Sequence, residues 1–157
     1  MQADHSTANC REMTDSNSCV FCRIVAGRSP ARTVYEDRDH LAFFPLEHIN
    51  PGHVVLIPKQ HTDYLFDLSP MAYVSLWATA ARIAPPLKEV MSAKRVGVAV
   101  EGFSVPHVHV HLVPIYAFDD LNPARAKALE AAEVDRLHSL ICSALMKDAR
   151  QQDGLAG

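Results

Sequence analysis

Hydrophobic residues in this chain fall into short segments and longer ones, with two different periods. Five short segments are either continuously apolar or alternate between apolar and polar residues, and Gly, Pro or Asp bounds most of them. Segments of this kind are typical of β-strands. The predicted strands are Thr33–Glu36, Leu41–Phe44, Val54–Ile57, Arg95–Val100 and His107–Pro114.

A longer segment repeats its apolar residues at helical spacing. It follows Ser69 and Pro70, which are typical of an N-cap and of the first position of a helix. Pro85 and Pro86 lie inside the segment, so we expect them to kink or split the helix. The apolar stripe of this helix comprises Tyr73, Leu76, Trp77, Ala80, Ile83 and Leu87.

A second long helix is predicted near the C-terminus, and Asn122 with Pro123 indicates its start by the same capping argument. A short helix over residues 20–26 would end at Gly27. The order of strands, long helix, strands and final helix predicts an α+β fold with an antiparallel sheet. The apolar stripe of the C-terminal helix comprises Leu137, Leu140, Ile141, Ala144 and Leu145.

The most informative segment is residues 107–111, where three histidines alternate with two valines. In a strand, His107, His109 and His111 would point to one face, with neighbours about 7 Å apart. Three imidazoles on one face suit metal binding or nucleophilic and acid–base chemistry, because imidazole titrates near neutral pH. The alternative is the polar face of an edge strand without any chemistry.

The composition limits the classes of function. The chain has 157 residues, of which 48% are hydrophobic, enough for the core of one domain. Its formal net charge of −3 offers no basic surface for duplex nucleic acid. No apolar stretch is long enough to cross a membrane, and residues 1–18 lack the apolar core of a secretory signal. We therefore expect a cytoplasmic protein with a flexible leader over residues 1–18.

Two of the four cysteines, Cys19 and Cys22, form a Cys-x-x-Cys pair. In a cytosolic protein this spacing indicates metal binding or redox chemistry rather than a structural disulfide. The pair is only half of a tetrahedral metal site, so two further ligands must come from elsewhere in the chain. Cys142 lies in the C-terminal helical pattern, where we expect a buried hydrophobic role, and Cys10 has no predicted role.

These motifs together resemble the histidine-triad (HIT) family of nucleotide hydrolases and transferases, in particular its zinc-containing bacterial members. The resemblance follows the family order over residues 19–116. It rests on the histidine run, on Cys19–Gly27 and on residues 50–59, which read Asn-Pro-Gly-His-Val-Val-Leu-Ile-Pro-Lys. The implied organisation is a HIT domain over residues 19–118, a C-terminal helical extension over residues 119–150 and a flexible tail over residues 151–157.

The resemblance implies that His109 is the nucleophile. It would attack the α-phosphate of a nucleotide at a phosphoramidate or phosphoanhydride bond, forming a covalent nucleotidyl-histidine that water then hydrolyses. His111 would hydrogen-bond the phosphate or the leaving group. A carbonyl oxygen on a neighbouring segment, which the sequence does not identify, would fix the tautomer of His109. Ser104 matches a position that would hold a phosphate oxygen, with a turn serine as the alternative. His53 matches another family position, where we expect a hydrogen-bonded structural histidine.

The resemblance also supplies the missing metal ligands. In zinc-containing members they are the histidine after Pro-Lys-x and the first triad histidine, which are His61 and His107 here. Together with Cys19 and Cys22 they would close a Cys₂His₂ tetrahedron around a structural zinc ion. A reduced thiol pair without metal is the alternative.

The resemblance also implies a base-binding pocket, because the base-binding positions of the family are apolar and aromatic rings there would stack on a base. Ordinary core packing is the alternative at each position. Pro45 stands where an Asp often grips the ribose, and Val100 and Phe103 stand where Asn and Gln often contact phosphate. These departures would weaken or redirect nucleotide hydrolysis. The implied nucleotide-binding residues are Phe21, Ile24, Phe43, Phe44, Leu46, Ser104, His109 and His111, with Val20 beside them.

Three functions stay open at this point. The first is the nucleotide hydrolase, and the second is a non-catalytic HIT-fold nucleotide sensor or interaction module, which the three departures favour. The third is an enzyme in which His107, His109 and His111 together bind a catalytic metal ion. The resemblance also implies a homodimer, with the long helix and the Arg95–Val100 strand as the expected interface.

Overall fold

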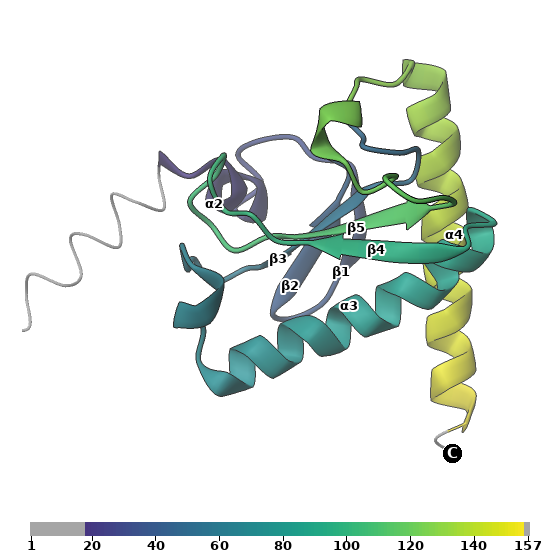
Figure 1. The fold of residues 1–157 in the computed structure, drawn as a ribbon. Coiled ribbons are helices and arrows are strands. Elements are labelled where there is room, and N and C mark those ends of the chain that lie inside the picture. Colours follow the sequence, from purple (N-terminus) through teal and green to yellow (C-terminus); the bar gives the residue numbers. More distant parts are fainter. Residues whose placement is uncertain (1–17, 156–157) are drawn as a thin grey trace, which may run out of the picture.

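Five antiparallel strands form one sheet in the order β1-β2-β3-β5-β4 (Figure 1). The computed structural model describes residues 18–155, so the leader predicted over residues 1–18 lies outside this range except for its last residue. All four neighbouring pairs are antiparallel, as predicted. The strands are β1 (Thr33–Glu36), β2 (His40–Phe43), β3 (Val54–Pro58), β4 (Arg95–Ala99) and β5 (Val110–Ile115).

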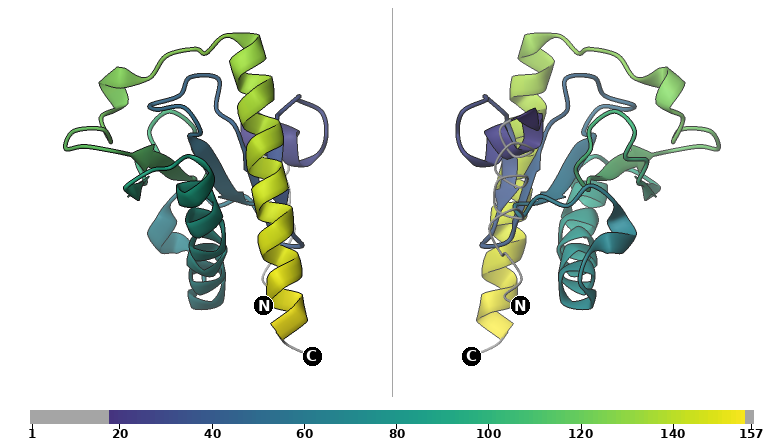
Figure 2. Two further views of the ribbon diagram at one scale, coloured as in Figure 1. Left: turned by 90° about the vertical axis from the view of Figure 1, so that its right-hand side faces the viewer. Right: turned by 90° about the vertical axis from the view of Figure 1, so that its left-hand side faces the viewer.

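Helices cover both faces of this sheet, but unequally. The two long helices pack on one face and against each other, whereas one short helix covers part of the other face (Figure 1, Figure 2). The α+β fold predicted from the sequence is therefore confirmed. No helix of the described residues is long and apolar enough to cross a membrane. The helices are α2 (Val20–Val25), α3 (Pro70–Val90) and α4 (Ala131–Leu155), with 3₁₀ turns η1 (Leu65–Asp67) and η2 (Pro123–Arg125).

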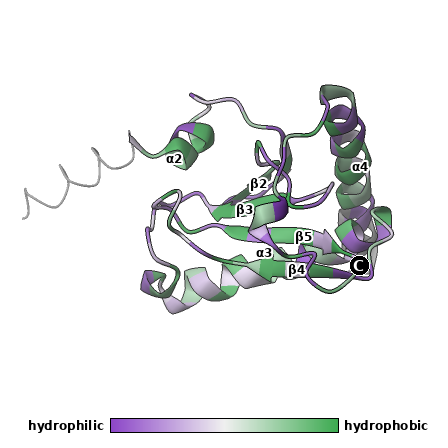
Figure 3. Cartoon of the chain, turned by 45° about the horizontal axis from the view of Figure 1, so that its top comes forward, coloured by the Kyte–Doolittle hydropathy of each residue, from purple (hydrophilic) through white to green (hydrophobic). Residues whose placement is uncertain are grey.

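The larger core lies between the sheet and helices α3 and α4, where green, apolar segments of the strands meet the helices (Figure 3). Helix α4 contributes Leu137, Ile141 and Leu145 at intervals of four residues, which places all three on one helical face. Leu140, predicted in the same stripe, is 37% exposed because it lies at the flank of that face. Each buried leucine or isoleucine contributes about 1.5–3 kcal/mol to stability.

Helix α3 begins as the sequence predicts but is not split. The Ser69 hydroxyl accepts a hydrogen bond from the Ala72 amide at 3.2 Å and caps the helix. Pro85 and Pro86 lie within one continuous helix of 21 residues. They remove the hydrogen bonds to the carbonyls four residues earlier, on residues 81 and 82. Both of those residues are exposed, so water can take the place of the missing donors.

The C-terminal region differs from the prediction at both of its ends. Asn122 does cap a helical turn, because its side-chain oxygen accepts from the Ala124 amide at 3.0 Å, but that turn is only η2. The long helix α4 starts later, at Ala131, because the intervening segment pairs with the main chain of His48 through Lys127. Helix α4 also continues to Leu155, beyond the start of the tail predicted at residue 151.

The strand predicted over His107–Pro114 is shorter than expected at its start. β5 begins at Val110, so His107 and His109 precede it. Pro58 at the end of β3 has no amide hydrogen to offer, and the Val108 amide instead donates to the carbonyl of Thr62 at 2.7 Å. On the other side, β4 ends at Ala99, which pairs with His111.

A smaller cluster lies on the opposite face of the sheet, under helix α2. Side chains of β2 and β3 form its base, and α2 packs Phe21, Ile24 and Val25 against them. A helix of six residues is not stable alone in water, so its position depends on contacts with the sheet. The strand residues of the cluster are Leu41, Phe43, Val55 and Ile57.

The placement of α4 predicts unequal effects for two leucines of the same helix. Leu137→Ala removes a fully buried side chain and should lower the free energy of unfolding by about 2–5 kcal/mol. Leu140→Ala, at a site that is 37% exposed, should cost less than about 1 kcal/mol. Urea unfolding monitored by circular dichroism measures both values, and equal losses would contradict the packing of α4 described above.

Candidate functional site

The three histidines of the run all face the side of the sheet that α2 covers. His111 pairs with Val55, and cross-strand partners share a face, so both lie on the α2 side. The rings of His109 and His111 are 5.0 Å apart between centroids. The Phe21 ring contacts His107 and His109 at 5.8 and 5.3 Å. The common face predicted from the sequence therefore exists, although only His111 lies within β5.

His109 is oriented by a single backbone hydrogen bond. Its Nδ1 lies 2.6 Å from the carbonyl oxygen of His107. A carbonyl only accepts, so Nδ1 carries the proton and Nε2 keeps its lone pair. A neutral imidazole in this tautomer presents Nε2 as a nucleophile. The prediction that this carbonyl lies on a neighbouring segment is wrong, because it belongs to the residue two positions earlier in the same segment.

The tautomer of His111 is set through a second histidine. The Ile49 amide donates to Nδ1 of His53 at 3.3 Å, so the proton of His53 is on Nε2. That Nε2–H donates to Nδ1 of His111 at 2.9 Å. His111 therefore carries its own proton on Nε2, the nitrogen not used by His53. His53 was expected from the sequence to be a hydrogen-bonded structural histidine. In the structure its hydrogen bond is to His111 of the run, and it fixes the tautomer of that ring.

Burial keeps these rings neutral. Burial, together with the neighbouring histidines, lowers the pKa of His53 to about 3 and the pKa of His111 to about 4. Protonation of His53 would also put a hydrogen on Nδ1, the atom that now accepts from the Ile49 amide, so that two donors would face each other. At neutral pH the two rings therefore hold the same tautomers, and His111 offers Nε2–H as a hydrogen-bond donor.

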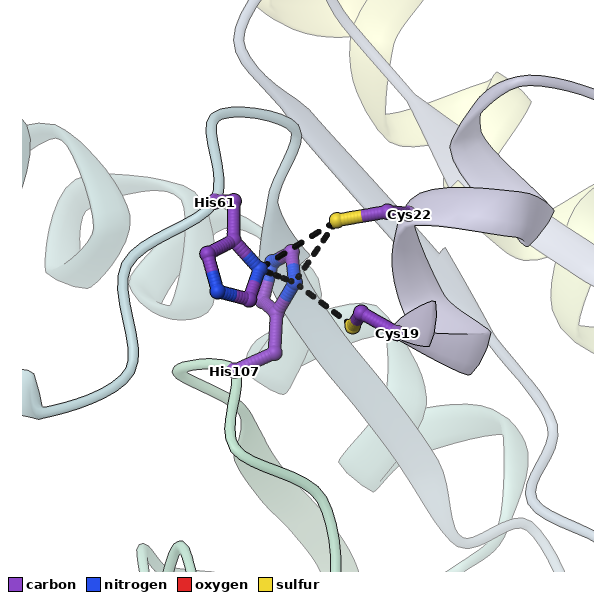
Figure 4. Close-up of side chains that lie close together, drawn as sticks. All are labelled: Cys19, Cys22, His61 and His107. Carbon is purple, nitrogen blue, oxygen red and sulfur yellow. Dashed lines mark hydrogen bonds between the residues drawn. The ribbon is translucent and has the colours of Figure 1, made fainter. Parts of the chain in front are cut away.

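Four side chains from three separate segments meet beside this triad (Figure 4). Cys19 and Cys22 come from the start of α2, His61 from the loop after β3, and His107 from the segment before β5. Their ligand atoms all lie within 4.8 Å of one another. His107 Nδ1 lies 3.5 Å from Cys19 Sγ and 3.3 Å from His61 Nδ1, and Cys22 Sγ lies 3.2 Å from His61 Nδ1.

The chemistry of this donor set fits a zinc ion. Tetrahedral Zn–N and Zn–S bonds of normal length place ligand atoms about 3.3–3.8 Å from one another, close to the spacing here. His107 donates its Nε2–H to the Pro58 carbonyl at 2.8 Å, so its Nδ1 presents a lone pair to the other ligands. Without a cation, burial and the neighbouring Cys19 raise the pKa of Cys22 to about 11. A bound divalent cation reverses that preference and deprotonates the thiols.

The implied base-binding residues separate into two groups. Phe21, Ile24 and Phe43 belong to the cluster under α2, with the rings of Phe21 and Phe43 5.5 Å apart. Phe44 lies on the other face of the sheet, in the larger core against His48, because consecutive residues of an extended chain point to opposite sides. The placement of Phe44 therefore contradicts its assignment to the base pocket. Leu46 is 95% exposed.

Ser104 lies in the loop that leads into the histidine run. It is exposed and borders a depression of about 360 Å³ beside the four-residue donor set. Of the three departures from the family pattern, Phe103 is exposed in this loop, Val100 packs against the larger core and Pro45 is half-buried. The depression is lined by Ser18, Cys19, Val20, His61, Asp63, Ser104, Val105 and Pro106.

Comparison with known proteins agrees with this arrangement. Residues 26–118 match the HIT domain family. An uncharacterized HIT-like protein of Mycobacterium tuberculosis is 34% identical over 116 residues, 71% of this chain and 81% of the relative. The adenylylsulfatase HINT3 of Arabidopsis thaliana is 24% identical over 139 residues, 85% of this chain and 71% of the relative.

A solved structure of a zinc-bound relative shares the fold of this chain. The crystal structure of a zinc-bound histidine triad family protein from Mycobacterium smegmatis matches with a TM-score of 0.72 and 31% identity, covering 84% of this chain and 96% of that one. The matched family region contains all three histidines of the run, and the structural match extends over most of the described fold. The chain therefore belongs to the histidine-triad (HIT) family.

Proposed function

We propose that this protein is a nucleotide hydrolase or transferase that cleaves a phosphoramidate or phosphoanhydride bond at the α-phosphate of a nucleotide. The observation that carries the proposal is the 2.6 Å hydrogen bond from His109 Nδ1 to the His107 carbonyl, which leaves Nε2 free to attack. Family membership supports it, because relatives of this chain such as HINT3 are nucleotide hydrolases.

The proposed reaction has two steps at one nitrogen. The lone pair of His109 Nε2 forms a bond to the α-phosphorus while the bond to the leaving group breaks. Water then attacks the same phosphorus and breaks the phosphorus–nitrogen bond, which restores the imidazole. His111 donates Nε2–H to a phosphate oxygen in both steps and so stabilises the charge that develops there.

The nucleotide base is proposed to lie against the cluster under α2. Phe21 contacts both Phe43 and His109, so a base beside this ring would hold its α-phosphate near the nucleophile. Ile24 extends the apolar surface of this cluster. Stacking and apolar contact tolerate any base, and the departures at Pro45 and Phe103 leave few polar contacts to the ribose and the phosphate.

A catalytic metal held by all three histidines of the run is not favoured. His107 uses Nδ1 in the cysteine-containing donor set and Nε2 on the Pro58 carbonyl, so neither nitrogen is free for the other two histidines. His109 and His111 each use Nδ1 in a hydrogen bond as well. A nucleotide sensor without turnover is the alternative that the experiment below separates from the enzyme.

We propose that Cys19, Cys22, His61 and His107 hold a structural zinc ion. Four protein ligands complete a tetrahedron and leave no position for a catalytic water. The ion would join α2, the loop after β3 and the start of the histidine run, three segments that are far apart in the sequence. The zinc-bound relative from Mycobacterium smegmatis supports this assignment.

We further propose a homodimer in which β4 takes part, because β4 is an edge of the sheet and its outer backbone groups are free to pair with another strand. Val98 on this strand is 41% exposed, and Met71 and Val74 near the start of α3 are exposed as well. The cytoplasmic location stays a prediction from the sequence.

The nucleophile is tested by intact-protein mass spectrometry after rapid mixing with AMP-phosphoramidates and dinucleoside polyphosphates. We expect a nucleotide-sized adduct on the wild type and on His138→Ala, whose ring lies on α4 away from the triad, but none on His109→Ala. Binding without adduct or product in the wild type would instead support the sensor function. An adduct that persists in His109→Ala would remove His109 from the role of nucleophile.

The zinc site is tested by elemental analysis of protein purified without chelators. The wild type should contain about one zinc per chain, and Cys22→Ser should lose most of it and unfold at a lower temperature. Cys142→Ser is the matched control, because Cys142 lies on α4 next to His138 rather than in the donor set. A wild type that binds no zinc, or equal zinc contents in both variants, would contradict the proposal.

The buried neutral state of His53 predicts a pH-dependent stability. The unfolded chain takes up a proton at this residue near its ordinary pKa of 6.5, whereas the folded chain takes it up only near pH 3. The free energy of unfolding should therefore fall as the pH is lowered from 6.5 toward 3, by up to about 1.4 kcal/mol per pH unit from this group.

Denaturant unfolding at a series of pH values measures this slope. His53→Gln removes the titrating group, so its stability should fall less steeply than that of the wild type over the same range. Titrating groups that do not contact His53 act equally in both proteins and cancel in the comparison, whereas His111, hydrogen-bonded to His53 at 2.9 Å, contributes to the difference. Parallel slopes would show that His53 is not a buried neutral histidine.

A further inference from the structure

We propose that the Cys19–Cys22 pair is an oxidation site at which peroxide forms a disulfide and thereby disassembles the nucleotide site. The inference rests on the proposed function, since it concerns how that same site is regulated. Three features carry it, namely access of solvent to Cys19, the position of Phe21 between the two cysteines, and the double role of His107.

Solvent reaches the donor set from one side. Cys19 and Cys22 are only 5% and 9% exposed, but Cys19 and His61 both line the depression of about 360 Å³ beside the loop that carries Ser104. A molecule as small as hydrogen peroxide can enter a depression of that size. The other lining side chains offer no cysteine or methionine that would consume the oxidant first. Cys19 is therefore the sulfur that peroxide meets.

Phe21 connects the cysteine pair to the nucleophile. It lies between the two cysteines in the sequence, and its ring contacts His109 at 5.3 Å and Phe43 at 5.5 Å. The six-residue helix that carries Phe21 is held on the sheet by one apolar cluster and by the two cysteines. Loss of the cysteine anchor removes one of these two attachments, and a helix this short does not persist without them.

His107 provides a second connection. Its ring belongs to the donor set, while its carbonyl oxygen accepts the hydrogen bond that fixes His109. A displacement of His107 therefore changes the tautomer and the direction of the nucleophile. The structure thus links both cysteines to His109 along two routes, one through a side chain and one through the main chain.

The oxidation requires one equivalent of peroxide. The thiolate of Cys19 attacks one peroxide oxygen, so that a sulfur–oxygen bond forms, the oxygen–oxygen bond breaks and hydroxide leaves. The thiolate of Cys22 then attacks this sulfur, forming the disulfide and releasing a second hydroxide. Both sulfurs lose one electron and both oxygens gain one. The two sulfurs start within 4.8 Å of each other, and a disulfide no longer supplies the two thiolates that a metal ion needs.

The test treats the reduced, zinc-loaded protein with one to a few equivalents of hydrogen peroxide. A chromogenic chelator follows zinc release, and intact mass with peptide mapping follows a loss of about 2 Da at residues 19–22. Hydrogen exchange measures how stably α2 is folded on the sheet. Carbethoxylation of His109 by diethyl pyrocarbonate measures how accessible the ring of this residue is to solvent. None of these measurements needs a nucleotide, so they stand whether or not the protein turns one over.

We expect zinc release and disulfide formation to proceed together, with roughly tenfold faster exchange in α2 and faster carbethoxylation of His109, all reversed by dithiothreitol and zinc. The Cys10→Ser/Cys142→Ser variant, which retains only the pair, should respond as the wild type does. Phe21→Ala should raise carbethoxylation of His109 in the reduced protein without releasing zinc.

Two results would overturn the inference. One is retention of zinc while Cys10, Cys142 or another residue is oxidised instead. The other is a disulfide between Cys19 and Cys22 that changes neither exchange in α2 nor the reactivity of His109. Failure of the proposed function would show itself separately, as the absence of any nucleotide adduct on the reduced protein.

Discussion

The site depends on one constraint, which is that each histidine of the run uses one ring nitrogen on a fixed partner and leaves the other for chemistry. His109 donates to the carbonyl of His107, and His107 donates to the carbonyl of Pro58. The Ile49 amide donates to His53, and His53 in turn donates to His111. Backbone groups cannot exchange donor for acceptor, so they determine the tautomer of every ring. Burial keeps His53, His107 and His111 neutral, and the free nitrogens of the run suit the proposed roles of nucleophile, donor and metal ligand.

The same constraint explains why the donor set and the triad are inseparable. His107 belongs to both, with its ring facing the cysteines and its carbonyl facing His109. A strand would have spaced the three histidines evenly along one face. The backbone instead leaves the sheet before Val110, because β3 ends at a proline and Val108 bonds outside the sheet. That departure lets His107 turn toward the cysteines while His109 stays beside Phe21.

Periodicity in the sequence was sufficient for the fold and for the shared face of the histidines. Strand bounds agree within one or two residues at four of the five strands, because alternation and continuous apolar runs follow directly from burial. The metal ligands came from spacing and from family resemblance, since Cys-x-x-Cys alone specifies only half a site. The failures share a cause. Asn122 caps a turn rather than a helix, Phe44 faces the wrong side, and the carbonyl that orients His109 was unidentified, because loop paths decide all three.

The departures from the family pattern lie outside the buried residues that orient the histidines. Residues that set the chemistry are buried and tied to the main chain, so a substitution there costs both stability and function. None of the three departures is fully buried, because Phe103 is exposed and Pro45 and Val100 are partly buried, and such positions tolerate change at a lower cost to folding. A chain can therefore keep the residues proposed as nucleophile and metal ligands while its contacts to the ribose and the phosphate diverge. The intact triad argues for retained phosphorus chemistry, and the altered loop argues that selectivity among substrates is where this protein differs from its relatives.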